Sequence, residues 1–172
     1  MKICLENVSK NYGKQKILAD INLSMQENEI FGLIGPSGSG KTTLIRLMTG
    51  AISSDSGTVY LGRQKMPNLE ALEWIGYMPQ NDALYLDLSG RDNLRFFGAM
   101  MGMKKAVLED RIDEVLALVS LEHDEKKCVQ NYSGGMKKRL SLATALLHKP
   151  KILFLDEPTV GIDPILRKKI WD

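Results

Sequence analysis

The stretch EIFGLIGPSGSGKTT, residues 29–43, decides the fold of this chain. Its first six residues, 29–34, form a short and mostly apolar run, which predicts a strand. Clustered glycines and serines follow, and such clusters are typical of a loop. The residues from about Lys41 to Thr49 then predict a helix that Gly50 terminates. The stretch therefore predicts a strand, a tight loop and a helix in direct succession.

The glycine-rich loop satisfies G-x-x-x-x-G-K-[ST], the pattern of a phosphate-binding loop. Backbone N–H groups can approach phosphate oxygens there because glycine has no Cβ, and the next helix adds the positive end of its dipole. Lys41 would reach the β and γ phosphates, and the Thr42 hydroxyl would ligate Mg²⁺. A glycine-rich turn that matches by chance is the alternative, and the flanking strand and helix argue against it. The predicted nucleotide-binding residues here are Gly35, Pro36, Ser37, Gly38, Ser39, Gly40, Lys41, Thr42 and Thr43.

Two acids, Asp156 and Glu157, follow the apolar run 151–155, which predicts a strand buried on both faces as in a parallel sheet. In phosphate-loop proteins an acid at the end of a neighbouring strand holds Mg²⁺, and Asp156 has that context. Glu157 would polarise the water that attacks the γ-phosphate. A pair of exposed turn acids is the alternative, and the phosphate loop favours the catalytic interpretation.

Composition limits the function classes. The 172 residues suit one domain, with a hydrophobic content of 44% and a charged content of 26% that are typical of globular proteins. The net charge of +2 is too balanced for a nucleic-acid footprint, and the basic run 137–139 is interpreted as a solvated helix face. Two cysteines suit a reducing compartment, and no apolar stretch approaches the roughly 18 residues of a membrane helix. These features predict a cytoplasmic protein.

The remaining strands are predicted from alternation. Residues 2–8 and 17–25 alternate like half-buried strands on either side of a turn at 11–13. Residues 57–60 and 74–78 are predicted to be further strands.

A helical insertion is predicted from Leu88 to about Leu121, with Ser89 as the N-cap of its first helix. Apolar residues at helical spacing continue after Lys104. Another helix should follow the turn at 133–135 and end at Lys149, before a proline.

These motifs together resemble the nucleotide-binding subunit of an ATP-binding cassette (ABC) transporter. The segment Asn131–Met136, N-Y-S-G-G-M, is similar to the family's signature, usually Leu-Ser-Gly-Gly-Gln, and it precedes Glu157 in the family's order. Tyr132 and Met136 depart from the commonest leucine and glutamine. The phosphate-facing part, Ser133-Gly134-Gly135, is intact, so the resemblance implies that its γ-phosphate contact survives.

The resemblance implies further site residues. Gln80 matches the Q-loop glutamine that contacts Mg²⁺ and the attacking water, and Asp163 matches the D-loop at the dimer interface. Tyr12 matches the aromatic residue that stacks on adenine, and a simple turn tyrosine is the alternative. The resulting sets are Glu157, Gln80 and Lys41 for catalysis; Thr42, Gln80 and Asp156 for the metal; and Tyr12, Ser133, Gly134, Gly135 and Asp163, with the phosphate loop, for nucleotide.

The fold that the resemblance implies is α/β. It is a phosphate-loop NTPase core with a mixed sheet, an N-terminal antiparallel part and a helical insertion. Residues 1–87 and 150–172 would form the core, and 88–149 the helical subdomain that carries the signature. No histidine follows Glu157, and neither His123 nor His148 is placed as the family's switch histidine. We therefore expect a chain that is incomplete at the C-terminus, lacking a strand and helices, with apolar surface exposed where they would lie.

The function implied is an ATP-binding and ATP-hydrolysing subunit that energises a membrane transporter. The signature and the run 157–163 look most like drug, peptide or ion exporters. Such a subunit uses ATP and Mg²⁺, pairs with a second ABC subunit as an ATP-sandwich dimer, binds no nucleic acid, and lies at the inner face of the cell membrane through a permease. The permease would dock near 81–103, whose Phe96, Phe97, Met100, Met101 and Met103 serve either as a docking groove or as core. A soluble, non-transport ABC ATPase and a fragment that binds nucleotide without turnover are the alternatives.

Overall fold

The computed structural model describes residues 1–158 of the chain. The chain divides into two compact units, Met1–Ile75 and Gly76–Asp172. No helix within the described part is long and apolar enough to cross a membrane. The α/β class and the antiparallel N-terminal part predicted from the sequence are confirmed.

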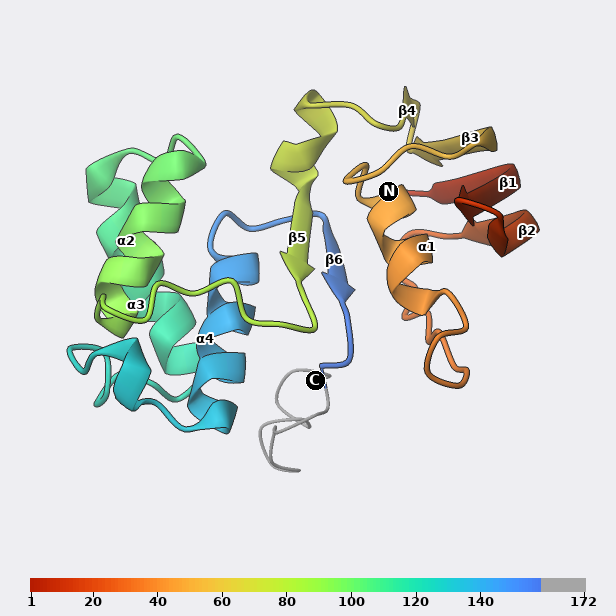
Figure 1. Ribbon diagram of the computed structural model, residues 1–172. Helices are drawn as coiled ribbons and strands as arrows, with labels where there is room; N and C mark the ends of the chain where they lie inside the picture. The colour runs from red at the N-terminus through yellow and green to blue at the C-terminus, as the bar shows by residue number, and fades with distance from the viewer. Residues whose placement is uncertain (159–172) are drawn as a thin grey trace. The chain divides into compact units, whose positions relative to one another are not determined.

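The first unit is built on a four-stranded sheet in the order β2-β1-β3-β4 (Figure 1). Its strands are β1 (Ile3–Tyr12), β2 (Gln15–Met25), β3 (Ser56–Leu61) and β4 (Gln64–Lys65). Neighbouring strands are antiparallel throughout. The short β4 and a 3-10 helix at Glu70–Trp74 were not among the elements predicted from the sequence.

The β1–β2 turn lies later than predicted. Tyr12 is still in β1 and pairs with Gln15, so the turn consists of Gly13 and Lys14. Gly13 has a φ of 59°, a left-handed conformation that glycine adopts without steric cost. The alternating pattern correctly predicted the two strands. The position of the turn between them depends on the left-handed conformation of Gly13.

The helix after the glycine-rich loop, α1, spans Lys41–Met48 with Thr49 as its C-cap. Gly50 follows with a φ of 74°, so the predicted terminator is confirmed. One face of α1 is buried, and the helix contacts β3 of the sheet. This contact anchors the helix that begins at the phosphate loop.

The predicted strand at 29–34 is absent from the structure, which assigns no regular secondary structure there. Ile30 is 72% exposed and Ile34 is 99% exposed. A strand needs a neighbour to accept and donate its backbone hydrogen bonds, and the segment pairs with no strand in the described part of the chain. Apolar composition alone was therefore not sufficient for this prediction.

The second unit contains a two-stranded sheet of β5 (Ile75–Met78, whose first residue belongs to the first unit) and β6 (Ile152–Leu155). The two arrows point the same way in Figure 1, so both strands end at one edge. The Asp156 amide donates to the Met78 carbonyl at 3.0 Å, just beyond this edge. In β6 only Phe154 is buried, whereas burial on both faces was predicted; among described strands, β6 has β5 alone as a neighbour.

Within residues 76–158, the second unit has three α-helices: α2 (Gly90–Met100), α3 (Lys105–Leu118) and α4 (Gly134–Leu146). The predicted N-cap is confirmed, since the Ser89 hydroxyl accepts from the Asp92 amide at 3.1 Å. A 3-10 helix, Val129–Asn131, precedes α4. The last helix ends before the predicted Lys149, which adopts a φ of 55° ahead of Pro150.

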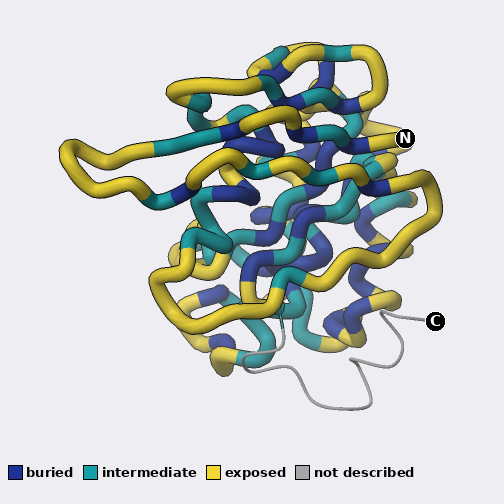
Figure 2. The backbone as a smooth tube through the Cα atoms, turned by 90° about the vertical axis from the view of Figure 1, so that its right-hand side faces the viewer, coloured by how far each residue is buried: buried dark blue, intermediate teal, exposed yellow. Residues whose placement is uncertain are grey.

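The core of the second unit joins both strands to α2, α3 and α4, since Met78 of β5 is buried in it and Leu153 and Leu155 of β6 pack against it. Figure 2 colours the chain by how far each residue is buried. Its fully buried large side chains include Met78, Leu94, Ile112, Leu116, Leu121, Leu140, Leu142 and Leu147. This core holds the ends of β5, β6 and α4 in fixed positions, and those ends carry the predicted site residues of this unit.

Candidate nucleotide-binding and catalytic site

The phosphate loop belongs to the first unit and depends on its glycines. Gly38 and Gly40 have φ values of 81° and 91°, a region that side chains with a Cβ rarely adopt. A Cβ on Gly40 would lie 2.9 Å from Leu18 Cδ2, and one on Gly35 would lie 2.9 Å from Ser39 Oγ. An added Cβ at either position would force a neighbouring side chain to shift, so the loop is a closely fitted backbone cradle, which fits phosphate.

Lys41 curls back over this cradle. Its Nζ donates to the carbonyl oxygens of Gly35 and Pro36, both at 2.8 Å. The Leu44 amide donates to the Gly40 carbonyl at 2.8 Å, which starts α1 directly behind the loop. Thr42 and Thr43 occupy the first turn of that helix, where the positive end of the helix dipole lies. An ammonium group and a helix N-terminus thus meet at one loop.

Tyr12 ends β1 with 47% of its surface exposed. The two residues before it are fixed by Asp55, which accepts from the Asn11 amide at 2.7 Å and from Lys10 Nζ at 2.8 Å. The Lys10 and Asn11 hydrogen bonds lower the pKa of the Asp55 carboxyl. An exposed aromatic ring on an anchored backbone suits stacking on a flat base.

The second unit brings Gln80, Asp156 and Glu157 to one edge, where β5 and β6 end. Asp156 is only 2% exposed, whereas Gln80 and Glu157 are exposed. Gln80 Nε2 donates to Glu157 Oε2 at 2.9 Å. The sequence placed Gln80 and Glu157 in separate motifs, and the fold joins them directly.

Glu157 has a φ of 55°, a left-handed conformation for a residue with a side chain. Such a conformation costs about 1–2 kcal/mol. The buried Asp156 immediately before it and the hydrogen bond from Gln80 hold Glu157 in this position. Backbone strain of this kind is common at functional sites.

The signature residues begin α4. Ser133 is its N-cap, with Oγ accepting from the Met136 amide at 3.2 Å. Apart from its chain neighbours and the helix backbone, no atom of residues 1–158 lies within 4 Å of where a Gly134 Cβ would stand. An open helix N-terminus with a hydroxyl and a bare glycine can accept an anion. Gly135, next in the helix, is half-buried.

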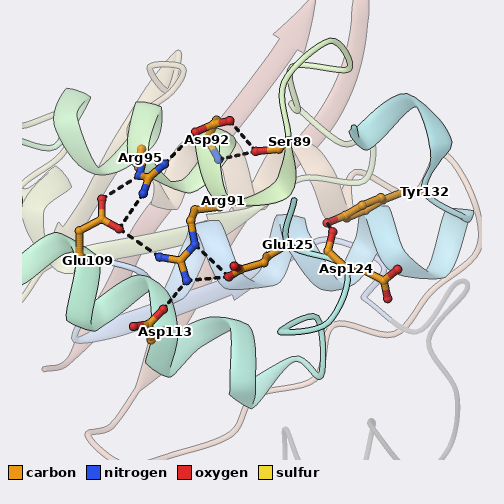
Figure 3. Close-up of polar contacts among 9 residues, drawn as sticks. All are labelled: Ser89, Arg91, Asp92, Arg95, Glu109, Asp113, Asp124, Glu125 and Tyr132. Carbon is orange, nitrogen blue, oxygen red and sulfur yellow. Dashed lines mark hydrogen bonds and ion pairs between the residues drawn. The ribbon is translucent and has the colours of Figure 1, made fainter. Parts of the chain in front are cut away.

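Tyr132, immediately before Ser133, anchors the signature to the segment around Asp124. Its ring is buried and its hydroxyl donates to the Asp124 carbonyl at 2.8 Å (Figure 3). Burial raises the pKa of Tyr132 to about 12. The next residue, Glu125, accepts from the Arg91 Nε at 2.9 Å, so the segment before the signature is tied to α2 as well.

The prediction that the basic run 137–139 is a solvated helix face is wrong. Arg139 is half-buried and donates to the Val119 and Ser120 carbonyls, and the side chain of Lys138 is only 13% exposed. Its Nζ donates to the Gln80 carbonyl and pairs with Asp82 Oδ1 at 3.2 Å. The contact spans 58 residues, so no local sequence pattern could have indicated it.

The metal prediction is not tested by the structure. Three or more His, Cys, Asp or Glu side chains grouped to hold a metal do not occur among residues 1–158. Mg²⁺ on nucleotide needs no such group, because one or two protein oxygens plus phosphates suffice. The buried carboxylate of Asp156 and the hydroxyl of Thr42 are oxygen donors of the right type. Asp163, the predicted D-loop residue, lies outside the described residues.

The 81–103 segment combines exposed and packed apolar side chains. Phe96, Met100 and Met101 are 38%, 70% and 43% exposed, whereas Met103 packs against the core of the second unit. The Phe96 ring meets Tyr85, which is itself 47% exposed, edge to face at 4.5 Å. Part of the predicted docking surface is therefore accessible on this unit.

Known proteins match nearly the whole chain. A sequence profile described as "ABC transporter" matches residues 18–160. The linearmycin resistance ATP-binding protein LnrL of Bacillus subtilis is 42% identical over 97% of this chain and 54% of its own length. A Nod factor export ATP-binding protein of Cupriavidus pinatubonensis is 39% identical over 98% of this chain and 52% of its own. The chain thus spans about half the length of these curated relatives.

Solved structures agree on the fold. An ATP-binding subunit of an ABC transporter superposes with a TM-score of 0.88 at 25% identity, over 99% of this chain and 72% of that chain. A dimeric, post-hydrolysis state of an ATP-binding cassette bound to ADP and Pi gives 0.88 at 27% identity, over 98% and 79%.

Proposed function

The chain belongs to the ABC transporter family, and from this premise we propose that it is the ATP-hydrolysing subunit that energises an ABC membrane exporter. The observation that carries the proposal is the hydrogen bond from Gln80 to Glu157, beside the buried Asp156, where β5 and β6 end. The printed names of two relatives, which concern linearmycin resistance and Nod factor export, support the export role.

The phosphate loop binds the triphosphate through its backbone amides, and Lys41 neutralises charge on the β and γ phosphates. Tyr12 stacks on the base. Thr42, Asp156 and Gln80 would hold Mg²⁺, which would neutralise charge that develops on the phosphates. The carboxylate of Glu157 accepts a hydrogen bond from the attacking water and receives its proton, while the Gln80 amide keeps that carboxylate oriented. As the water oxygen bonds to the γ-phosphorus, the bond from that phosphorus to the β–γ bridging oxygen breaks, and ADP and phosphate leave.

Two copies of the chain, or one copy and a second ABC subunit, close around two nucleotides in this proposal. Ser133, Gly134 and Gly135 of one subunit meet the γ-phosphate that the other holds, and Asp163 lines the interface. An isologous pair of this kind explains why one chain carries two anion-binding helix N-termini. The exposed apolar residues of 81–103 receive a permease, which places the subunit at the inner face of the membrane.

MgATP hydrolysis tests the proposal when it is measured beside nucleotide binding on one preparation. Glu157→Gln should lower turnover by roughly 10²-fold or more and leave binding intact, because general-base catalysis contributes about 10²–10⁴-fold. Glu122→Gln, at an exposed turn, is the matched control.

Three outcomes are informative. Binding without turnover in the unmodified chain would favour a nucleotide-binding module. A rate of ATP hydrolysis that is unchanged by Glu157→Gln would show that Glu157 is not the general base. Turnover without any associated permease in the native cell would favour a soluble ABC ATPase.

A further inference from the structure

We infer that Lys138 is a positioning residue for hydrolysis, through which the signature helix holds Gln80 on Glu157. The inference rests on the proposed function. It starts from a single ammonium group that joins α4 to the segment after β5.

Lys138 makes two contacts on that segment. Its Nζ donates to the Gln80 carbonyl and lies 3.2 Å from Asp82 Oδ1. The side chains of Lys138 and Asp82 are 13% and 20% exposed, so solvent screens this ion pair less than it screens a surface pair. One ammonium thereby hydrogen-bonds to the backbone at residue 80 and forms an ion pair, without a hydrogen bond, with the carboxylate at residue 82.

The fixed backbone matters because Gln80 itself is exposed. Its amide reaches Glu157 Oε2 at 2.9 Å from an otherwise solvated position. A long, flexible side chain keeps one rotamer only when its backbone is held, since rotamer freedom opposes the contact. Lys138 holds the Gln80 backbone through its hydrogen bond to the Gln80 carbonyl.

The other end of the same helix carries the signature. Ser133 caps α4, and Lys138 follows within two turns on one rigid helix. A shift of Ser133 when it meets a phosphate would move Lys138, and with it the Gln80–Glu157 pair. The contacts form one continuous path from the signature to the proposed general base: Ser133, α4, Lys138, Gln80 and Glu157.

The test compares Lys138→Met and Lys138→Arg with the control Lys137→Met, which alters the neighbouring charge on the same helix. For MgATP hydrolysis, Lys138→Met should lower kcat about tenfold or more, because small displacements of a reacting group are costly. KM should stay within about twofold, since the phosphate loop is untouched. Lys138→Arg should restore most of the rate, and Asp82→Asn, which keeps the bond to the Gln80 carbonyl, should give an intermediate value.

A second readout needs no turnover. The side-chain amide NMR signal of Gln80 can be assigned by its loss in Gln80→Ala. In the unmodified protein and in Lys138→Arg, this signal should report an amide group with restricted motion. In Lys138→Met it should resemble a freely rotating glutamine. An unchanged Gln80 signal in Lys138→Met would overturn the inference, and so would an unchanged kcat where the unmodified protein hydrolyses ATP. If Glu157-dependent turnover is missing altogether, the proposed function fails while the NMR signal still decides the role of Lys138.

Discussion

The phosphate loop and the Gln80–Glu157 cluster differ in how far along the chain their contacts reach. Lys41 bonds to carbonyls five and six residues before it. Gln80 and Glu157 are 77 residues apart, and Lys138 is 58 residues from Gln80. The first site is thus assembled by neighbours in sequence and the second by packing. Substitutions should therefore act locally in the loop and through the fold in the cluster.

Lys41→Met should give the largest effect, and it tests the local site. Loss of one preorganised cationic donor costs about 10²–10³-fold in turnover. Because its two hydrogen bonds go to nearby carbonyls, the free energy of unfolding should change by less than about 1 kcal/mol. Urea unfolding and MgATP hydrolysis measure both, with the exposed Lys105→Met as the control. A large loss of stability would show that Lys41 holds more than its own loop.

Gly90→Ala tests how tightly the second unit is packed around Tyr132. A Cβ at residue 90 would lie 2.3 Å from the Tyr132 hydroxyl, which cannot retreat without losing its bond to the Asp124 carbonyl. Overpacking of this kind costs about 1–3 kcal/mol. The penalty should largely vanish in a Tyr132→Leu background, so a double-mutant cycle by urea unfolding should show strong coupling. Equal penalties in both backgrounds would rule out Tyr132 as the cause.

Gly40→Ala and Gly134→Ala compare glycines of the two sites. Gly40 has a φ of 91° and Leu18 lies close by, so alanine should cost about 1–2 kcal/mol. Gly134 has nothing within 4 Å, so alanine should stay within about 0.5 kcal/mol. Thermal unfolding measures both. Similar losses for the two variants would mean that the backbone conformation of residue 40 is not the deciding factor.

Asp55→Asn should give the smallest effect, and pH reveals it. The folded pKa of Asp55 is lowered by its bonds to Lys10 and Asn11. A lowered pKa means that its stabilisation is present above the unfolded pKa and is lost as pH falls through the folded one. The difference in stability between the unmodified protein and the variant should therefore shrink on acidification. A difference that is independent of pH would show that the charge of Asp55 contributes nothing.

Much of the fold followed from the sequence because its signals are local. Ser89 and Ser133 cap the helices after them, and Gly50 ends α1. The apolar run 29–34 failed as a strand because pairing partners are not encoded in the run itself. The hydrogen bonds from Lys10 and Asn11 to Asp55, which fix the backbone before Tyr12, could not be predicted either, because they join the end of β1 to the residue before β3.

The sequence by itself determined the glycine cradle, its lysine, the helix that follows and the order of motifs that marks the family. Backbone conformation at glycine and the start of a helix depend on adjacent residues, so a short pattern is sufficient. Only the tertiary structure decided three contacts. Gln80 donates to Glu157, the nearly buried Lys138 donates to the Gln80 carbonyl, and the Tyr132 hydroxyl donates to the Asp124 carbonyl. Those contacts form when the helices and strands of the second unit pack, because packing brings segments that are distant in sequence side by side. For the buried Tyr132 hydroxyl and the nearly buried Lys138 ammonium, burial also requires a polar partner.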